Sequence, residues 1–169
     1  MNINVDSVGF KNFLSFGSKW QDVPLKHGLN LVTGGDASRY KSNGAGKSSF
    51  LESIIFALYV KTARSIKKNQ VLNWKNKKKC EVILTARRGS NVYSFHRGIK
   101  PDVLIVTENG KEFPVSDKRS FQEEIEEELI GIDFKSYQNL IHCNPNITIS
   151  IQNTPKPQKR EIFERIINL

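Results

Sequence analysis

One short segment constrains this chain more than any other: the glycine-rich residues 43–49, which are Asn43, Gly44, Ala45, Gly46, Lys47, Ser48 and Ser49. Glycines let a backbone turn so tightly that its N–H groups point inward at an anion, and a helix N-terminus behind them adds a favourable dipole. Lys47 can reach two successive phosphates as a point charge, and the Ser48 hydroxyl can coordinate Mg²⁺. The segment is therefore predicted to be a P-loop that binds the phosphates of a nucleotide together with Mg²⁺.

The flanking residues supply the strand–loop–helix context that a P-loop requires. Residues 28–33 are predicted to form a strand, because Leu29, Leu31 and Val32 are bounded by glycines. A helix is predicted to begin near Gly46, since apolar residues recur behind it with helical spacing. These residues are Phe50, Leu51, Ile54, Ile55, Leu58 and Tyr59. A chance Gly-x-Gly-Lys-Ser in an ordinary turn is the competing interpretation, and the context disfavours it.

One position departs from the P-loop pattern. The pattern asks for a glycine five residues before Gly46, where this chain has Lys41. Gly34 or Gly35 is the candidate for that role, with the intervening residues looped out. The insertion at residues 35–42 has two open interpretations: it reaches over the nucleotide, or it extends into solvent.

The rest of the chain is predicted to contain strands followed by helices. Strands are predicted at residues 3–10, 81–86, 91–97, 103–107 and 111–115, with turns at 89–90 and 109–110. Helices are predicted at residues 117–130, 133–141 and from 154 onward, with Gly131 ending the first. The acidic run at 123–128 is interpreted as a solvated helix face. The last apolar stripe is still open at Leu169, which is typical of a truncation.

Length and composition favour one soluble domain. The chain has 169 residues, of which 38% are hydrophobic and 25% charged, and its net charge is +9. Such a charge fits either a polyanionic partner or simple solubility. No segment approaches the ~18 apolar residues of a membrane-spanning helix, and residues 1–10 do not resemble a secretion signal. The scattered cysteines and histidines give no basis for a disulfide framework or a zinc site, and a cytoplasmic location is expected.

A basic segment at residues 61–79 contains no acidic residue and follows the predicted P-loop helix. Its cationic residues, with two from a later hairpin, are candidate contacts to DNA phosphates, which would give salt-dependent and sequence-independent affinity. The candidates are Lys61, Arg64, Lys67, Lys68, Lys75, Lys77, Lys78, Lys79, Arg97 and Lys100. A solvated surface is the alternative. Trp74 lies among them, and we expect it to pack in the core rather than to stack on a base.

The chain resembles the SMC-like ABC ATPases of DNA double-strand-break repair, the SbcC type, which include the large subunit of tailed-phage recombination nucleases. The resemblance rests on the loop at 43–49, on a Lys-Asn-Phe-Leu-Ser turn at 11–15 and on the helix sequence at 51–58. Residues 97–101 and 134–137 are also similar to the family. These matches extend over nearly the whole chain.

The resemblance implies an α/β fold of the P-loop NTPase class: an ABC-type ATPase head lobe with a mixed sheet plus an antiparallel β layer. Residues 1–169 would then form a single domain, the N-terminal half of the head, with a helix at about 154–169 leading toward a coiled coil. ATP and Mg²⁺ are the implied cofactors, and Lys11 and Ser15 join the candidate cofactor-binding residues. The family's Q-loop falls at about 141–150, where Asn144 or Asn146 is the candidate metal contact in place of a glutamine.

The resemblance also implies partners: the chain's own C-terminal head half, an ATP-dependent homodimer, a repair nuclease subunit and double-stranded DNA, without a membrane. The family's Walker B carboxylates lie in the C-terminal half, so ATP hydrolysis is expected only in the completed head. Residues 103–108 are interpreted as a strand, because Thr107 stands where an aspartate is needed. Two alternatives stay open: another P-loop enzyme such as a kinase or GTPase, or a nucleotide-gated DNA-binding module without turnover.

Overall fold

The computed structural model describes residues 3–35, 44–64 and 66–141, and near the C-terminus residues 155–157, 159–160 and 164. The expectations for most of the insertion, for Asn43, for Asn144 and Asn146, and for most of the last helix fall outside these residues. Within the described part of the chain, no helix is long and apolar enough to cross a lipid bilayer.

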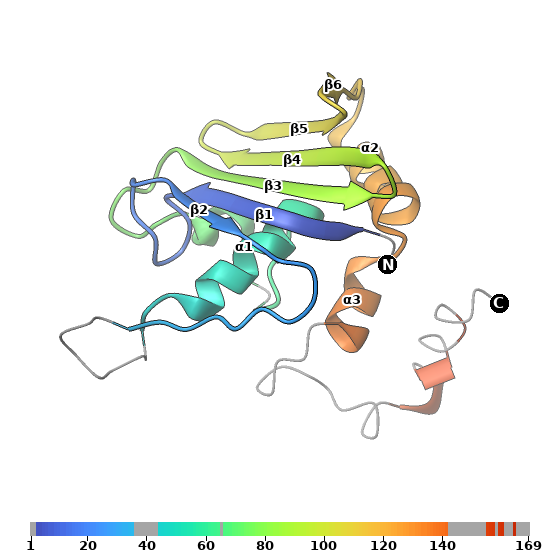
Figure 1. The fold of residues 1–169 in the computed structure, drawn as a ribbon, viewed down its shortest axis with the longest axis horizontal. Coiled ribbons are helices and arrows are strands. Elements are labelled where there is room, and N and C mark those ends of the chain that lie inside the picture. Colours follow the sequence, from blue (N-terminus) through green and yellow to red (C-terminus); the bar gives the residue numbers. More distant parts are fainter. Residues whose placement is uncertain are drawn as a thin grey trace.

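Six antiparallel strands form one sheet in the order β2-β1-β3-β4-β5-β6 (Figure 1). Their bounds are β1 Asn4–Lys11, β2 Gln21–Pro24, β3 Cys80–Arg88, β4 Asn91–Ile99, β5 Val103–Glu108 and β6 Lys111–Glu112. The turn residues Gly89, Asn109 and Gly110 have positive φ, which glycine and asparagine tolerate. The predicted hairpins are thus confirmed. The last strand, predicted at 111–115, is shorter than expected and ends at Glu112.

Alternating burial along β3 and β4 creates the covered face of the sheet. In β3, Val82, Leu84 and Ala86 are buried and alternate with less buried residues. The same alternation places Tyr93 and Phe95 of β4 on that face, and the register pairs Leu84 with Phe95. A period of two along each strand therefore puts one set of side chains into the core.

Helix α1 (Lys47–Tyr59) packs against this face (Figure 1). The ring of Phe56 lies 5.5 Å from that of Phe13, centroid to centroid, and Phe50 lies 6.4 Å from Phe10. Burying a side chain of this size contributes roughly 1.5–3 kcal/mol. These contacts hold the helix on the sheet, and with it the glycine-rich loop at the helix N-terminus.

Two short helical units follow the sheet where helices were predicted, and the predicted end at Gly131 is confirmed. Helix α2 (Lys118–Glu124) begins after Asp117, whose carboxylate accepts two backbone N–H groups of the first turn. It continues as a π-helix, η2 (Ile125–Ile130), which ends at Gly131 with φ 72°. Helix α3 (Phe134–Leu140) is capped by Asp133 in the same way. The acidic run is at the surface as expected, with Glu123, Glu124, Glu127 and Glu128 exposed.

The strand predicted at residues 28–33 is wrong. The segment has no regular secondary structure, and the second strand of the sheet is instead β2, at the edge beside β1. Leu29 is 100% exposed and Leu31 is 87% exposed. A β-strand needs a hydrogen-bonded neighbour, and the described residues supply none for this segment.

Phe95 offers a test of the core. Replacing this fully buried residue with alanine is expected to lower the free energy of unfolding by about 3–5 kcal/mol, because it leaves a cavity beneath the sheet. Val92→Ala on the same strand is the matched control, since Val92 is 40% exposed and its loss should cost about 1 kcal/mol or less. Urea unfolding followed by circular dichroism measures both. Equal losses would contradict the assignment of the buried face.

Candidate nucleotide-binding site

The glycine-rich loop turns directly into α1. Gly44 and Gly46 have φ of 84° and 90°, a region that L side chains rarely adopt. A Cβ at Gly46 would also lie 2.9 Å from the Phe16 ring and 3.2 Å from Ser15 Oγ. Glycine is therefore required at Gly46 both for its backbone angle and for space. The turn aims the first N–H groups of α1 away from the helix body, where an anion can accept them.

A cavity of about 460 Å³ opens at this helix start. Its walls are Ser15, Gly44, Ala45, Gly46, Lys47, Ser48, Ser49 and Arg64. Ser48 is exposed, and Ser15 Oγ donates a hydrogen bond to Ser49 Oγ at 3.0 Å. The first turn of α1 carries no acidic side chain, so no carboxylate competes there for the positive end of the helix dipole. The cavity can therefore receive a phosphate group beside a hydroxyl that suits a hard cation.

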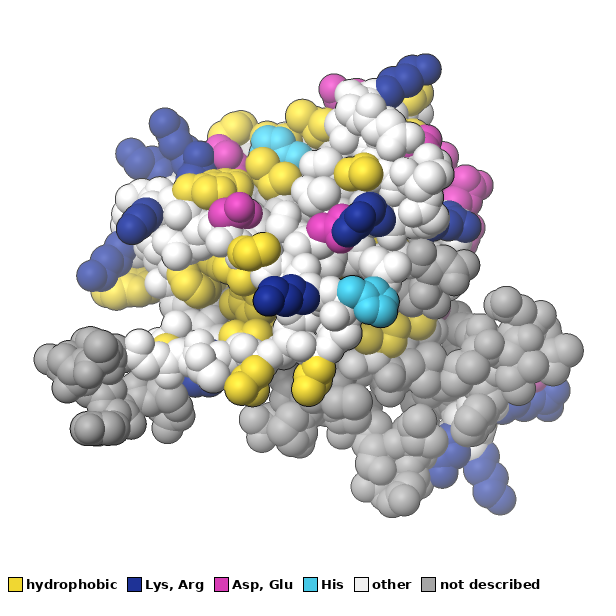
Figure 2. Space-filling model, in the orientation of Figure 1, with side chains coloured by type: hydrophobic (Ala, Val, Ile, Leu, Met, Phe, Trp, Pro, Cys, Tyr) yellow, Lys and Arg dark blue, Asp and Glu magenta, His cyan; other side chains and the backbone are white. Residues whose placement is uncertain are grey.

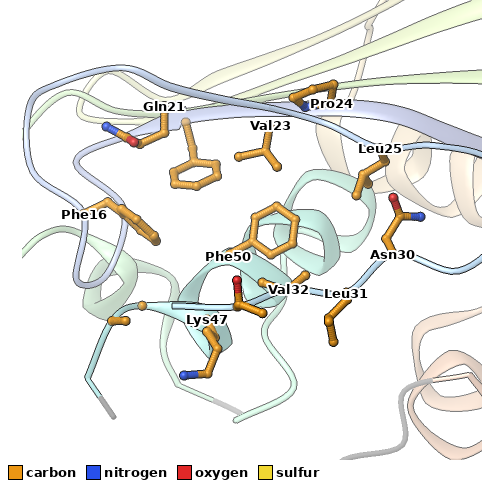
Figure 3. Close-up of a pocket in the computed structure, with 14 residues that line it drawn as sticks. Phe16, Gln21, Val23, Pro24, Leu25, Asn30, Leu31, Val32, Lys47 and Phe50 are labelled. Carbon is orange, nitrogen blue, oxygen red and sulfur yellow. The ribbon is translucent and has the colours of Figure 1, made fainter. Parts of the chain in front are cut away.

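A second cavity of about 380 Å³ adjoins Lys47, between β2 and residues 30–33 (Figure 3). Its walls are largely apolar, and Figure 3 shows Phe16, Val23, Leu25, Leu31 and Phe50 around it. The unpaired segment at 30–33 thus runs along the P-loop helix and leaves an apolar gap against β2.

Gly34 makes a close approach to the glycine-rich loop. A Cβ at Gly34 would lie 2.5 Å from the Cβ of Ala45, whereas a Cβ at Gly35 would meet open space. Gly34 is therefore the better of the two candidates for the missing glycine, because a side chain at this position would collide with the glycine-rich loop.

The structure brings Ser15 to the cavity but not Lys11. The antiparallel register sets Lys11 opposite Glu81, and the Lys11 ammonium lies 3.0 Å from the Glu81 carboxylate. The same ammonium lies 5.8 Å from the Trp20 ring centroid. Because β1 fixes this direction, Lys11 does not line the cavity, and its proposed contact to the cofactor is not supported.

Arg64 was predicted to contact DNA, yet it lies in the wall of the P-loop cavity. Its Nε is 3.5 Å from the carboxylate of Glu52, which is 3% exposed. The other carboxylate oxygen of Glu52 accepts the Ala63 N–H at 2.8 Å. Glu52 therefore fixes the start of the basic segment against α1. The sequence carries a signal for this pair: a single acidic residue inside the P-loop helix and an arginine soon after the helix.

The other basic candidates, Arg97 excepted, are exposed. Lys68 begins a short 3₁₀ helix, η1 (Lys68–Val71), and its ammonium lies 2.6 Å from Asp102, which also binds Lys118 at 2.7 Å. Hydrogen bonds from Lys118 and Lys68 hold the pKa of Asp102 below its usual range. Figure 2 shows Lys and Arg side chains gathered over one end of the sheet. Figure 1 shows that the loop leading into β3 lies at this end.

Arg97 was predicted to contact DNA, and the structure overturns this because Arg97 is 1% exposed. Its Nε donates to the Ala57 carbonyl at 2.9 Å and its Nη2 to Gln122 Oε1 at 2.8 Å. Burial lowers the pKa of its guanidinium to about 10, still charged at neutral pH. The cation thus sits at the C-terminal end of α1, where it is favoured by the helix dipole. Alternation after Tyr93 and Phe95 was the sequence signal that Arg97 faces inward.

Trp74 was expected to pack in the core, and this is wrong because its side chain is 69% exposed. The Lys75 ammonium lies 5.1 Å from the ring centroid. Other residues are buried here instead: Val71 and Leu72 within the basic segment, and Cys80 directly after it.

Comparison with known proteins decides the family. A family model described as an AAA domain matches residues 7–168. The chain belongs to this family. This AAA-domain chain is 32% identical over 170 residues to exonuclease subunit 2 of Enterobacteria phage T4, and 27% identical over 134 residues to the DNA double-strand break repair Rad50 ATPase of Sulfolobus acidocaldarius. The alignments cover 99% and 78% of this chain, but only 29% and 14% of the two relatives, so the chain spans less than a third of either.

Two solved structures share the fold of this AAA-domain chain. One, from work on ATP-driven dimerization and DNA-stimulated activation of SMC ATPases, superposes with a TM-score of 0.63 at 18% identity and covers 96% of this chain and 99% of the solved one. The SMC head bound to the C-winged helix domain of ScpA gives 0.57 at 19% identity, covering 96% and 54%. The predicted family is confirmed, and the fold is that of SMC ATPase heads. The described strands supply its antiparallel layer.

The buried position of Arg97 can be tested directly. Arg97→Ala is expected to lower the free energy of unfolding by about 1–3 kcal/mol, because Ala57 O and Gln122 lose their donor inside the core. DNA affinity of the folded protein should not change. The control is Lys100→Ala, which removes an exposed cation and should leave stability within about 0.5 kcal/mol. Urea unfolding and a DNA-binding titration measure the two quantities. Weaker DNA binding by Arg97→Ala at unchanged stability would contradict this assignment.

Proposed function

We propose that this AAA-domain chain is the ATP-binding half of an SMC-like ATPase that acts in double-strand-break repair and recombination. The observation that carries the proposal is the open cavity at the start of α1, walled by the left-handed glycines, Lys47 and Ser48. ATP is the proposed nucleotide because a relative that is 27% identical over 134 residues is named an ATPase. The exonuclease subunit 2 relatives of phages T4 and RB69 support a role beside a nuclease.

In the proposed complex, the N–H groups of residues 44–49 and the Lys47 ammonium would hold the phosphates of the nucleotide. Ser48 is the proposed Mg²⁺ ligand, and Asn43 and Ser49 are the remaining proposed nucleotide-binding residues. The donor set fits this ion, since a hydroxyl and phosphate oxygens are the hard donors that Mg²⁺ prefers. When bound, Mg²⁺ would neutralise charge that develops on the phosphates. Asn144 or Asn146 is retained as the proposed further metal contact.

Turnover is proposed to require the C-terminal half of the head. A general base is needed to activate water, and among the described residues the cavity wall holds no carboxylate. Glu108 is the last residue of β5, and its carboxylate accepts hydrogen bonds from Tyr93 and Asn91 at 2.6 and 2.7 Å. Its carboxylate is therefore engaged in the outer sheet.

The exposed residues 28–33 are the proposed docking surface for the C-terminal head half. Leu29 and Leu31 are apolar and open to solvent, and the apolar cavity beside Lys47 adjoins the same segment. A strand added alongside would satisfy the unpaired backbone and bury both leucines. The completed heads are then proposed to dimerise through ATP, to clamp double-stranded DNA and to control a nuclease subunit.

The exposed lysines of the basic segment and Lys100 are the proposed DNA contacts. Lys61, Lys67, Lys68, Lys75, Lys77, Lys78 and Lys79 complete this set. Lys68 is the weakest member, since Asp102 neutralises part of its charge. A nucleotide-gated DNA-binding module without turnover stays the second candidate, because the described residues contain the phosphate site and the basic surface but no base beside them.

Lys47→Ala tests the phosphate site. Calorimetry with ATP and Mg²⁺ should show affinity reduced about 10–100-fold, since a charge-assisted pair contributes about 1.5–3 kcal/mol. Lys61→Ala is the matched control, because Lys61 is an exposed lysine outside the cavity. With the C-terminal half supplied in trans, dimers should form only when ATP is present. Equal ATP binding by wild type and Lys47→Ala would refute the nucleotide site.

Arg64 is proposed to contact the nucleotide, with Glu52 as its positioning residue. Arg64→Ala should weaken ATP binding about 3–10-fold, the loss of one partly exposed charged contact. Glu52→Gln keeps an acceptor for the Ala63 N–H but releases Arg64, so it should weaken ATP binding in the wild type and add nothing in the Arg64→Ala background. Arg88→Ala is the exposed arginine control. Additive effects of the two substitutions would show that Glu52 does not act through Arg64.

A further inference from the structure

Trp74 is an exposed aromatic side chain within the basic segment. It is 69% exposed, and its neighbours in the sequence from Asn73 to Lys79 are asparagines and lysines. Exposed tryptophans in apolar patches mark protein docking surfaces. A single one surrounded by cations has a different physical profile, since it offers one π-face without an apolar neighbourhood.

A hydrogen-bond network holds the loop that carries Trp74 in one conformation. Asn73 is 4% exposed, its N–H donates to the Asn12 carbonyl at 2.8 Å, and its Nδ2 donates to the Leu14 carbonyl at 2.9 Å. Asn73 Oδ1 accepts the N–H groups of Lys75 and Asn76, each at 3.2 Å. The indole is therefore displayed on a fixed loop, and a ligand that stacks on it pays little to order the backbone.

Asn76 and Asn12 close the same loop from the other side. Asn76 Nδ2 donates to Asn12 Oδ1 at 2.6 Å, and Asn12 Nδ2 donates to the Lys79 carbonyl at 3.0 Å. Lys77 and Lys79 both have φ of 51°, in the left-handed region that non-glycine residues rarely enter. Such conformations cost free energy and persist only where the surroundings impose them, which is common at binding sites.

Positive charge surrounds the ring. Lys75, Lys77, Lys78 and Lys79 are exposed, and the Lys79 N–H donates to the Lys100 carbonyl at 2.8 Å, which brings a fifth exposed lysine beside them. The Lys75 ammonium lies 5.1 Å from the Trp74 ring centroid. Residues 61–79 contain no acidic residue to neutralise this group. An aromatic face within a cationic surface is the arrangement by which proteins hold single-stranded nucleic acid.

We propose that Trp74 is a stacking platform for an unpaired base of DNA, and that the lysines around it bind the adjoining phosphates. This rests on the proposed DNA-binding function and deepens it, because it names single-stranded DNA, as at a frayed or resected end, as the substrate class. Within a continuous duplex both faces of every base are already covered by neighbours, so Trp74 can stack only where the duplex opens. A stack of this kind does not depend on the base sequence.

The test compares two probes on the purified protein: a fluorescent 12-nucleotide oligothymidine and a relaxed circular duplex that has no ends. Trp74→Ala is expected to weaken binding of the oligothymidine about 5–100-fold, the range for loss of one base–aromatic stack. Its affinity for the circular duplex should change less than about twofold, since the phosphate contacts persist. Trp74→Phe should restore most of the oligothymidine affinity, because it keeps an aromatic face.

Two controls separate stacking from charge and from folding. In a Trp20→Phe background Trp74 is the remaining tryptophan of the two, and its fluorescence should be quenched by oligothymidine. Lys77→Ala should weaken both probes to a similar extent and reduce their salt dependence. Thermal unfolding of Trp74→Ala should match wild type, since the side chain is exposed.

The outcomes distinguish this proposal from the function on which it rests. Equal loss of both probes in Trp74→Ala, or no loss of either while Lys77→Ala loses both, would overturn the stacking platform and leave DNA binding in place. Failure of the wild-type protein to bind either probe would overturn both the stacking platform and the proposed DNA binding.

Discussion

The packing of α1 against the inner face of the sheet holds every part of the candidate site in place. Phe50 and Phe56 are buried between the helix and the aromatic residues of β1 and its turn. The two ends of the helix have opposite polar requirements. At the C-terminal end, Arg97 and Gln122 donate to the Ala57 and Leu58 carbonyls. At the N-terminal end, the glycine-rich loop borders an open cavity instead of the core. The candidate anion site is therefore at the helix end that the core does not cover.

The turn after β1 connects the two candidate binding surfaces. Ser15 and Phe16 contact the glycine-rich loop, as the close distances to Gly46 show. Three residues earlier in the same turn, Asn12 anchors the loop that displays Trp74, through Asn73. A few residues therefore position both a phosphate cavity and a basic, aromatic surface. Nucleotide-gated DNA binding, the second candidate function, would have a short physical route through this turn.

Much of the architecture could be predicted because it depends on local chemistry. The Asn109 and Gly110 turn, the Asp117 and Asp133 caps and the Gly131 stop follow from which residues tolerate positive φ or accept backbone N–H groups. The P-loop prediction depends on local sequence in the same way. The prediction of a strand at 28–33 was wrong because strand pairing is not local: the apolar residues are present, but the described chain offers no neighbouring strand. The prediction that Trp74 packs in the core was wrong because hydrophobicity alone does not determine whether an indole ring is buried.

The sequence by itself determined the family, the P-loop, the hairpins and the presence of a basic segment, since each rests on residue types at fixed spacing. Only the tertiary structure decided which cations face solvent. Arg97 and Lys100 are three residues apart, yet strand alternation and the C-terminal end of α1 bury the first, while the turn after β4 exposes the second. The tertiary structure also places Arg64 in the wall of the candidate nucleotide cavity, because the buried carboxylate of Glu52 lies next to its guanidinium. The sequence shows which side chains are charged, but not whether each one faces solvent or the core. The fold decides this, because desolvation and hydrogen bonding depend on neighbours that are distant along the chain.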